Sequence, residues 1–238
     1  MTPNHQQPSL MTTHNISPLL GWEDVYIITT RDGSNTLFSR SLNATYHSVY
    51  GAVAESKHVF IQNGLRTQSE RPDINILEFG FGTGLNAFLA YLFALNLEKS
   101  VTYTGIEAFP IDVGVARKLD YPYYLAYPEE GDIFLRMHEE DSFSSGPFTF
   151  NKIGSPIDIL TGSVYDCIFF DAFAPGAQPD LWDQSVFEVL FTLTSKGGCL
   201  VTYCAQGDVR RRLISAGYEV ERISGPPGKR EMLRAVKS

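Results

Sequence analysis

Long hydrophobic runs are absent from this chain of 238 residues, whose apolar stretches are strand-sized and interrupted by polar residues. A helix that crosses a bilayer needs about 20 consecutive apolar residues, so neither a membrane span nor a membrane partner is expected. The first 20 residues also lack a basic start followed by an apolar block, which argues against a secretory signal peptide. The sequence therefore predicts a cytoplasmic protein.

Cysteine is scarce as well. Cys167, Cys199 and Cys204 lie in apolar, strand-like runs and form no Cys-x-x-Cys pair. That spacing suits neither a disulfide framework nor a zinc site, and it predicts buried, reduced thiols. His47 and His58 are not at metal-ligand spacing either. We therefore expect no bound metal.

Positive charge is in deficit, with 19 Lys and Arg residues against 27 Asp and Glu residues and a net charge of -8. This balance argues against non-specific binding to nucleic acid and mildly favours a cationic substrate, although a local basic patch can still dominate one site. Glycine and proline, at 20 and 13 residues, are near average usage, which excludes collagen-like and low-complexity chains. The length suits one domain, or one domain with a small appendage.

The chain divides into three predicted parts, which are a disordered tail, a β-rich extension and a main domain at residues 1–20, 21–66 and 67–238. In the extension, two β-prone runs flank Asp32-Gly33, which predicts a hairpin. Residues 46–64 predict a short helix or turn followed by a strand with the sequence HVFIQ. The extension is too small to bury a core alone, so we expect it to pack on the main domain.

Apolar runs alternate with helical stretches through the main domain. Strands are predicted at 74–79, 101–107, 148–153, 165–171 and 197–204, and helices at 85–97, 180–193 and 206–216. This alternation predicts a parallel sheet with helices on both faces. The short GPPG turn between 218–223 and 230–236 adds an antiparallel hairpin. The expected fold is therefore α/β and Rossmann-like, of the class I methyltransferase type, with a mostly parallel sheet, a C-terminal hairpin and a small β-rich extension.

A glycine-rich turn, GFGTG at 80–84, joins the first strand of this sheet to a helix. Glycines let the backbone approach a ligand closely, and the helix N-terminus offers free N–H groups. The spacing is GxGxG rather than the GxGxxG of dinucleotide sites, and Glu78 stands two residues before the first glycine. This pattern suits S-adenosylmethionine, whose carboxylate can accept loop N–H bonds while Glu78 meets its ammonium. Any tight turn could use the glycines alone.

An acid closes the second strand as well. Glu107 lies 23 residues beyond Gly84, where a carboxylate can accept hydrogen bonds from both ribose hydroxyls of a nucleoside cofactor. NAD enzymes and methyltransferases share this feature, and an ordinary solvated carboxylate is the alternative. Glu107 therefore favours a nucleoside cofactor without choosing which one.

The fourth strand ends in Asp171, at the sheet edge where open α/β sheets bind ligands. A carboxylate there can accept N–H bonds from an amine, orient its lone pair and balance the positive charge of the methylated product. Phe173 can stack on the substrate, whereas capping of the next turn is the alternative role for Asp171. Asp166 is expected to cap or to lie in solvent, and Trp182 to pack or to contact substrate.

Several long motifs in the expected order resemble one known family. They are TYHSVYGAVAESKHVF (45–60), EFGFGTGLNAF (78–88), FFDAFAPGAQPDLW (169–182), YCAQGDVRRRL (203–213) and GPPGKREMLRA (225–235). Over about residues 24–236 the chain resembles the methyltransferase domain of the bacterial MnmC family, including its stand-alone MnmD-type members. The resemblance implies methyl transfer from S-adenosylmethionine to wobble 5-aminomethyl-2-thiouridine of tRNA. It also implies a GTPase–flavoprotein pair that installs the amine, and a chain of this length leaves no room for the FAD-dependent domain of fused members.

The resemblance also assigns roles to residues. It places Asp171 as the catalytic residue, facing the amine beside the cofactor. Cofactor binding is implied for Glu78, Gly80, Phe81, Gly82, Gly84, Asn86, Glu107 and Asp171, and substrate binding for Tyr46, Glu55, Phe173, Lys229 and Arg230. One departure concerns adenine recognition: an acid usually follows the third strand, but here Lys152-Ile153 leads to Gly154-Ser155-Pro156, and Asp158 lies slightly beyond.

Basic residues gather in two C-terminal segments, at Arg210, Arg211, Arg212, Lys229, Arg230 and Arg234. If the fold brings them to one rim, they can bind tRNA phosphates despite the acidic total; a solvated helix face is the alternative. The target base must also leave its stack, and Phe173 can receive it.

Other functions remain open on the same fold. An aminopropyltransferase or small-amine methyltransferase suits a cationic substrate, although the former should carry a second acid where Ala174 stands. An NAD(P)-linked oxidoreductase is disfavoured by the glycine spacing, and a non-catalytic RNA-binding module by the intact loop and Asp171. The segment 120–147 has no assigned role and is either a lid or a long connection.

Overall fold

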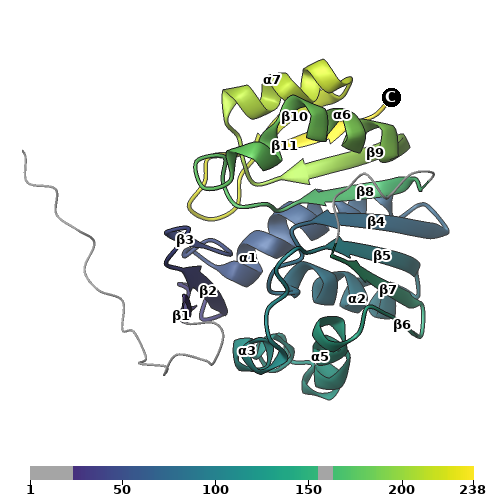
Figure 1. The fold of residues 1–238 in the computed structure, drawn as a ribbon. Coiled ribbons are helices and arrows are strands. Elements are labelled where there is room, and N and C mark those ends of the chain that lie inside the picture. Colours follow the sequence, from purple (N-terminus) through teal and green to yellow (C-terminus); the bar gives the residue numbers. More distant parts are fainter. Residues whose placement is uncertain (1–23, 155–162) are drawn as a thin grey trace, which may run out of the picture.

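The computed structural model describes residues 24–154 and 163–238, so the predicted tail at 1–20 and Asp158 lie outside the described residues. Its largest feature is an eight-stranded sheet (Figure 1). The strands follow the order β10 (Glu219–Ser224), β11 (Glu231–Val236), β9 (Thr194–Thr202), β8 (Tyr165–Phe170), β4 (Asp73–Phe79), β5 (Ser100–Ile106), β7 (Phe148–Ile153) and β6 (Ser142–Ser145).

The centre of this sheet is parallel, from β9 through β8, β4 and β5 to β7, and both edges are antiparallel hairpins. The predicted α/β fold with a C-terminal hairpin is therefore confirmed. The register matters for the site, because Phe79 of β4 lies opposite Ile106 on one side and Phe170 on the other. The residues that follow these three strands consequently leave the sheet at the same level.

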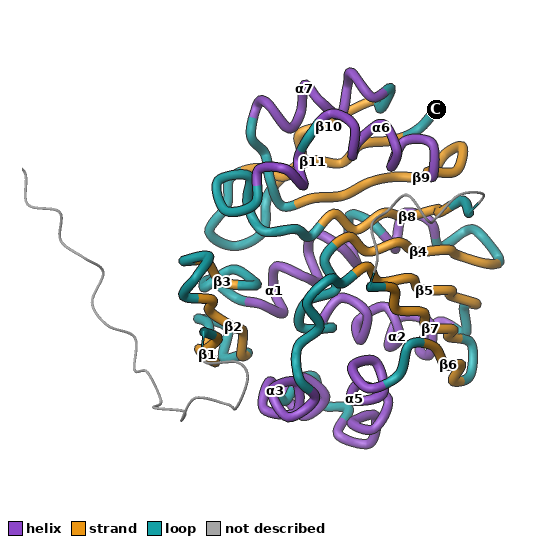
Figure 2. The backbone as a smooth tube through the Cα atoms, in the orientation of Figure 1, coloured by secondary structure: helices purple, strands orange, loops and turns teal. Residues whose placement is uncertain are grey.

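Helices cover both faces of the sheet, and successive side chains of β4 accordingly enter two different buried clusters. Ile74 and Ile76 join one buried cluster with α2 (Leu85–Leu97), whereas Leu77 and Phe79 join a second. The second cluster contains α6 (Gln184–Leu193) and α7 (Gly207–Ala216). The loops of the sheet gather beside the small N-terminal sheet, as the teal segments of Figure 2 show. No helix in 24–154 or 163–238 has the length and apolar content needed to cross a bilayer.

The predicted HVFIQ strand is wrong. These residues belong to a π-helical segment, η1 (Lys57–Gln62), which continues directly from α1 (Ala52–Ser56). Val59 and Phe60 are buried, and the Phe60 ring packs 5.2 Å from that of Phe169 in β8. Strand propensity depends on packing context, and here the apolar residues cover a face of the sheet instead of extending it.

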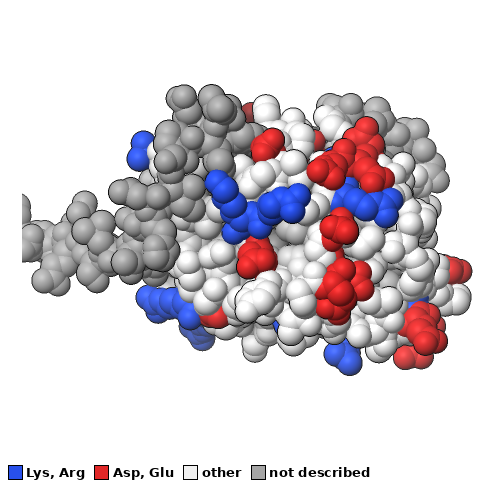
Figure 3. Space-filling view, turned by 90° about the horizontal axis from the view of Figure 1, so that it is seen from below, with Lys and Arg blue, Asp and Glu red and all other residues white. Residues whose placement is uncertain are grey.

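The segment left without a role is an ordered part of the fold. Residues 120–147 follow α3 (Val113–Leu119) and form α4 (Tyr121–Tyr124), η3 (Pro128–Glu130), α5 (Gly131–Glu139) and β6. Phe134 and Met137 of α5 are buried in the same cluster as α2. On the side of the molecule where α3 and α5 lie, basic and acidic side chains stand next to one another (Figure 3). This face therefore presents no field of one sign.

The N-terminal residues form a separate antiparallel sheet of β1 (Val25–Thr29), β2 (Asn35–Ser39) and β3 (Ala44–Thr45). The hairpin predicted at Asp32-Gly33 is confirmed, with Gly33 at φ 87°. Asp32 joins the hairpin to α1, because its carboxylate accepts hydrogen bonds from Thr30 Oγ1 at 2.7 Å and from the Ala54 N–H at 2.9 Å. The Tyr124 hydroxyl donates to the Asp32 carbonyl at 2.5 Å, so the small sheet packs on α4.

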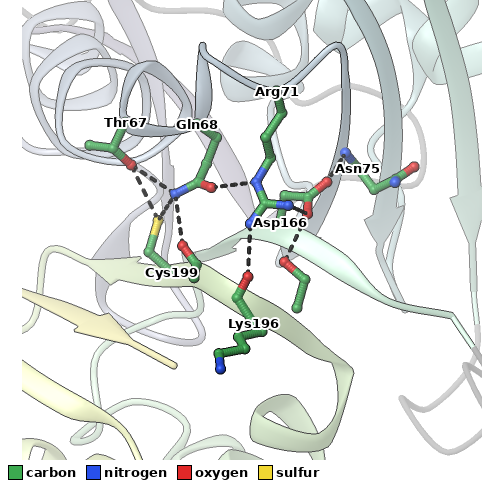
Figure 4. Close-up of polar contacts among 9 residues, drawn as sticks. Thr67, Gln68, Arg71, Asn75, Asp166, Lys196 and Cys199 are labelled. Atoms are coloured by element: carbon green, nitrogen blue, oxygen red, sulfur yellow. Dashed lines mark hydrogen bonds and ion pairs between the residues drawn. The ribbon is translucent and has the colours of Figure 1, made fainter. Parts of the chain in front are cut away.

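Asp166 lies neither in solvent nor at a helix cap, contrary to expectation. Its buried carboxylate forms an ion pair with Arg71 (3.0 Å) and accepts hydrogen bonds from the Asn75 N–H (2.9 Å) and Ser195 Oγ (2.8 Å) (Figure 4). It ties the start of β8 to β4 and β9, at the opposite end of β8 from Asp171. The same network reaches Cys199 through Gln68. All three cysteines are free and buried, as predicted.

Candidate active site

The glycine turn after β4 adopts backbone conformations that favour glycine. Gly80, Gly82 and Gly84 have φ values of 96°, 50° and 74°. A Cβ on Gly80 would lie 2.8 Å from the carbonyl oxygen of Asp171, and one on Gly82 would lie 3.1 Å from the Tyr46 ring. The turn therefore needs glycine both for its conformation and for the close approach of its neighbours.

Gly80→Ala is expected to destabilise the protein more than Gly146→Ala. Both substitutions strain a left-handed backbone, by about 1 kcal/mol or more. A Cβ at Gly146 meets no atom within 4 Å, whereas at Gly80 it collides with the backbone of Asp171. Thermal unfolding should show the larger fall in Tm for Gly80→Ala, and calorimetry should show a loss of S-adenosylmethionine affinity of about tenfold or more for that variant alone. Equal losses in both variants would contradict the close approach.

A chain of hydrogen bonds links the ends of β4, β5 and β8. Tyr103 of β5 donates its hydroxyl to Glu78 Oε2 at 2.6 Å. The Asn86 amide donates both to Glu78 Oε1 and to Asp171 Oδ2, each at 2.8 Å. Asn86 Oδ1 is buried and has no hydrogen-bond partner among the described residues. Two acids and one amide therefore share a compact site beside the glycine turn.

Both acids in this series of hydrogen bonds, Glu78 and Asp171, resist ionisation. Glu78 is fully buried, and burial raises its pKa to about 8, with repulsion from Glu107 adding to the effect. Asp171 is half-buried, and its pKa lies well above the usual value because of desolvation and then of repulsion by Glu78 and Glu55. Its hydrogen bond from Asn86 opposes that shift. Both side chains therefore favour the neutral, protonated form more strongly than ordinary acids do.

Glu107 lies at the other side of the same turn. Its Oε2 accepts a hydrogen bond from the Gly82 N–H at 2.7 Å, and its Oε1 accepts one from the Phe109 N–H at 2.8 Å. The carboxylate is half-buried and faces the turn. The third predicted carboxylate is thus brought to the place where β5 ends.

Two aromatic residues lie beside the carboxylates. The rings of Tyr46 and Phe173 meet edge to face with centroids 4.9 Å apart, and both side chains are half-buried. Burial and the charge of Glu107 raise the pKa of Tyr46 to about 12, so its hydroxyl stays protonated. Trp182 is fully buried and donates its indole N–H to the Phe173 carbonyl at 2.7 Å, so its role is packing.

Glu55 and Lys229 are paired with one another. Lys229 Nζ lies 2.7 Å from Glu55 Oε1, and the other Glu55 oxygen accepts the Ser48 N–H at 2.7 Å. The Lys229 ammonium also lies 3.8 Å from the centroid of the Tyr203 ring. The Tyr203 hydroxyl donates to the carbonyl of Ala172, next to Asp171. This ion pair therefore borders the Asp171 site.

The C-terminal arginines do not form one free basic patch. Arg211 is paired with Asp208, Arg234 with Glu221 at 2.7 Å, and Arg212 donates to the Trp182 carbonyl at 2.5 Å. Among the residues that the structure describes, Arg210 and Arg230 have no acidic partner. Lys152, near the position where an adenine-binding acid was expected, has a structural role, because its Nζ donates to the carbonyls of Met137 and His138 at the end of α5.

The sequence did not indicate His47 and Tyr103, which contact Thr83 of the glycine turn and Glu78 of β4. His47 Nε2 lies 2.6 Å from Thr83 Oγ1, and burial lowers the pKa of His47 to about 4, so the ring is neutral. Tyr103, which donates a hydrogen bond to Glu78, is predicted from the sequence only as a residue of the strand at 101–107. The alternation within that strand could have placed Tyr103 on a buried face, whereas no spacing signal connects His47 with Thr83.

The site residues fit S-adenosylmethionine. The chemistry of the donor set matches its parts: an acid for the ammonium, a carboxylate for the ribose, and a glycine turn that admits close backbone contact. The unpartnered Asn86 oxygen offers a further buried acceptor. Within 24–154 and 163–238, no group of three or more His, Cys, Asp or Glu residues could hold a metal ion.

Comparison with known proteins defines the class first. Residues 149–238 match a family described as S-adenosyl-L-methionine-dependent methyltransferase. The solved structure of MNMC2 from Aquifex aeolicus superposes with a TM-score of 0.73 and 26% identity, covering 88% of this chain and 69% of that one. Spermidine synthase from Thermotoga maritima shares the fold, with a TM-score of 0.54 and 11% identity over 89% of this chain and 68% of that one. The protein has the fold of the Rossmann-like, S-adenosylmethionine-dependent methyltransferases.

Curated relatives narrow this class. The tRNA 5-methylaminomethyl-2-thiouridine biosynthesis bifunctional protein MnmC of Pseudomonas putida (strain W619) is 31% identical over an alignment of 216 positions, which covers 82% of this chain and 32% of that protein. The protein of the same name from Vibrio cholerae is 30% identical over an alignment of 254 positions, gaps included, which covers 90% of this chain and 34% of that protein. The chain thus spans about a third of the length of these relatives. Over most of its own length this chain is similar to MnmC proteins, and it has the fold of an MnmC-type methyltransferase domain.

Proposed function

We propose that this domain methylates the exocyclic amine of wobble 5-aminomethyl-2-thiouridine, or its 2-oxo form, in tRNA to give the 5-methylaminomethyl nucleoside. The observation that carries the proposal is Asp171, a half-buried carboxylate linked through Asn86 to the glycine turn and bordered by the Tyr46–Phe173 pair. The names of the curated relatives support the choice of tRNA and of this nucleoside.

The cofactor would be held by residues already gathered at the ends of β4 and β5. Glu78 would accept hydrogen bonds from its ammonium, Glu107 from its ribose hydroxyls, and the turn from Gly80 to Gly84 would approach it without side chains in the way. Bound S-adenosylmethionine supplies a methyl group activated by a sulfonium. Asn86 would keep the two acids in one fixed arrangement.

Asp171 is the catalytic residue in this proposal. A nitrogen must be neutral to attack, and an aminomethyl group is largely protonated near neutral pH. Because the pKa of Asp171 is raised, its carboxylate can accept a proton from that ammonium and then hold the remaining N–H by a hydrogen bond. The nitrogen lone pair forms the new N–C bond as the methyl–sulfur bond breaks. The proton taken up by Asp171 must pass to solvent before transfer, so that the ionised carboxylate can balance the charge of the secondary ammonium product.

The aromatic pair would exclude water and receive the base. Tyr46 and Phe173 offer a ring face and a ring edge beside Asp171, and a flipped uracil needs such a surface to replace its lost stacking. Glu55 is engaged with Lys229, so in this proposal it acts by placing the ammonium near the site. The upstream GTPase–flavoprotein pair stays a prediction from the resemblance.

The direct test is a methylation assay on tRNA from cells that lack their own methyltransferase for this nucleoside. The protein and S-adenosylmethionine are added, and the wobble nucleoside is identified by mass spectrometry. We expect a gain of one methyl group on the aminomethyl nucleoside and none when cofactor is omitted. No gain, despite measured cofactor binding and an active control enzyme, would remove this substrate. Transfer from decarboxylated cofactor to a polyamine would instead support the aminopropyltransferase alternative.

A further inference from the structure

Two loops that are far apart in the sequence meet beside the Asp171 site. Tyr50, just before α1, lies against Gly228 in the loop between β10 and β11, which Figure 1 shows next to the small sheet. A Cβ on Gly228 would lie 2.3 Å from the Tyr50 ring, so the ring rests directly on the backbone. The neighbouring residue, Lys229, makes the ion pair with Glu55 that borders Asp171. The Tyr50 contact is therefore continuous with the predicted amine site.

Two exposed arginines, Arg31 and Arg230, belong to the segments that make this contact. The Arg31 guanidinium lies over the Tyr50 ring, 4.4 Å from its centroid, and the backbone N–H of Arg31 donates to the Val49 carbonyl at 3.0 Å. Arg230 follows Lys229 and is exposed, as is Arg31, while Tyr50 is 41% exposed. Within the described residues, neither guanidinium has an acidic partner.

Three acids of this region have other partners, and one of them, Glu231 beside Arg230, is paired with Arg222. The Asp32 carboxylate accepts hydrogen bonds from Thr30, Ser34 and the Ala54 N–H, which hold it against α1. Glu55 is 4% exposed and paired with Lys229. Among the described residues, the charges of Arg31 and Arg230 therefore remain unpaired beside the exposed Tyr50 ring. The α3–α5 face differs, because basic and acidic side chains stand together there (Figure 3).

We propose that Arg31, Tyr50 and Arg230 form a docking rim for the single-stranded RNA loop that carries the target nucleotide. The inference rests on the proposed function and names where the RNA docks. Unstacked RNA bases are bound by stacking on aromatic rings, and their phosphates by guanidinium groups. Arg31 and Arg230 contact the phosphates that flank the flipped nucleotide, and Tyr50 stacks on an adjacent base. The paired arginines of α7 and β11 contribute less.

The test measures the affinity of the full chain for aminomethyl-tRNA at several salt concentrations. Arg31→Ala and Arg230→Ala should each weaken binding several-fold and lower the salt dependence, log K against log salt, by about one unit per lost contact. The double variant should lose about tenfold or more, with S-adenosylmethionine affinity unchanged. Arg40→Ala is the matched control, because Arg40 lies over Tyr26 at 4.3 Å in the same sheet but at the other end of β2. It should leave tRNA affinity unchanged.

A second pair of variants isolates the stacking. Tyr50→Phe keeps the ring on Gly228 and should bind tRNA like the natural protein. Tyr50→Leu keeps an apolar contact but no ring, and should weaken binding about fivefold or more. Unchanged tRNA binding in the double arginine variant, or an equal loss in Arg40→Ala, would overturn the docking rim and leave the proposed function standing. A natural protein that binds cofactor but no tRNA would overturn both.

Discussion

Asp171→Asn is expected to lower the rate of methyl transfer by about 100- to 1,000-fold while changing S-adenosylmethionine affinity by no more than a few-fold. The substitution keeps the shape of the side chain, and its oxygen can still accept the hydrogen bond from Asn86. It removes the negative charge that accepts a proton from the amine and balances the ammonium product. The loss should therefore fall on kcat rather than on cofactor binding.

The pH dependence gives an independent readout. Because the pKa of Asp171 is raised, the carboxylate ionises only as the pH climbs above the usual range of an aspartate, and activity should rise with that ionisation. The fall in methyl-transfer activity at low pH that reflects protonation of Asp171 should be absent in the Asp171→Asn variant. Stability should move in the opposite direction. A raised folded-state pKa stabilises the protein at low pH and is lost as the pH rises, so Asp171→Asn should raise Tm at pH 8.

A matched control separates charge at the site from charge on the surface. Asp180 is an exposed acid in η5 (Pro179–Trp182), in the connection that follows β8. Asp180→Asn should change neither the rate of methyl transfer nor Tm. If Asp171→Asn retained the natural rate and the fall in activity at low pH, the catalytic assignment of Asp171 would be wrong and the amine would need another base.

The strands and most helices could be predicted because their signals are local. A buried parallel strand is a short apolar run, and the run at 74–79 became β4 while the helical stretch at 85–97 became α2 with the same bounds. The strand predicted for HVFIQ is wrong because β propensity alone does not show that these residues pack on the face of the sheet, where Phe60 contacts Phe169. No elements are predicted in 120–147, although Phe134 and Met137 are buried at helical spacing in α5, and α3 and β6 are also absent from the prediction.

The place of the three carboxylates could also be predicted. Glu78, Glu107 and Asp171 end or follow neighbouring parallel strands, and the strand ends of a parallel sheet share one edge. Which partner each acid finds could not be predicted. The Lys229–Glu55 pair joins residues 174 positions apart, and only the folded chain brings them together. The Arg211–Asp208 pair, in contrast, has helical spacing and was visible in the sequence.

Cofactor binding is expected to depend on pH through Glu78. Its raised pKa, about 8, means that the carboxyl is mostly protonated at pH 7 in the free protein. The ammonium of S-adenosylmethionine favours the ionised form, so binding should release a proton from Glu78. If binding requires that ionised form, affinity should rise by up to about tenfold per pH unit below pH 8. Glu78→Gln should bind at least about tenfold more weakly and lose this pH dependence.

Calorimetry in buffers of different ionisation enthalpy measures the protons released on binding. The amine of the cofactor titrates in the same range, so the informative quantity is the difference between the natural protein and Glu78→Gln, which should approach about one proton at pH 7. Tyr103→Phe provides a graded variant. The Tyr103 hydrogen bond lowers the pKa of Glu78, so its removal should move the midpoint to higher pH without abolishing it. No difference in proton release between the natural protein and Glu78→Gln would contradict an ammonium–Glu78 contact.

Stability supplies the check that needs no cofactor. A folded-state pKa of about 8 against an ordinary value of 4.5 means that Glu78 stabilises the fold most below pH 4.5, and that this contribution is lost as the pH rises through 8. The free energy of unfolding should therefore fall across that window more steeply in the natural protein than in Glu78→Gln. The pH dependence of cofactor binding and that of stability have the same cause. Burial of Glu78 makes its ionised form costly in the free protein, and the ammonium of the cofactor offsets that cost when it binds.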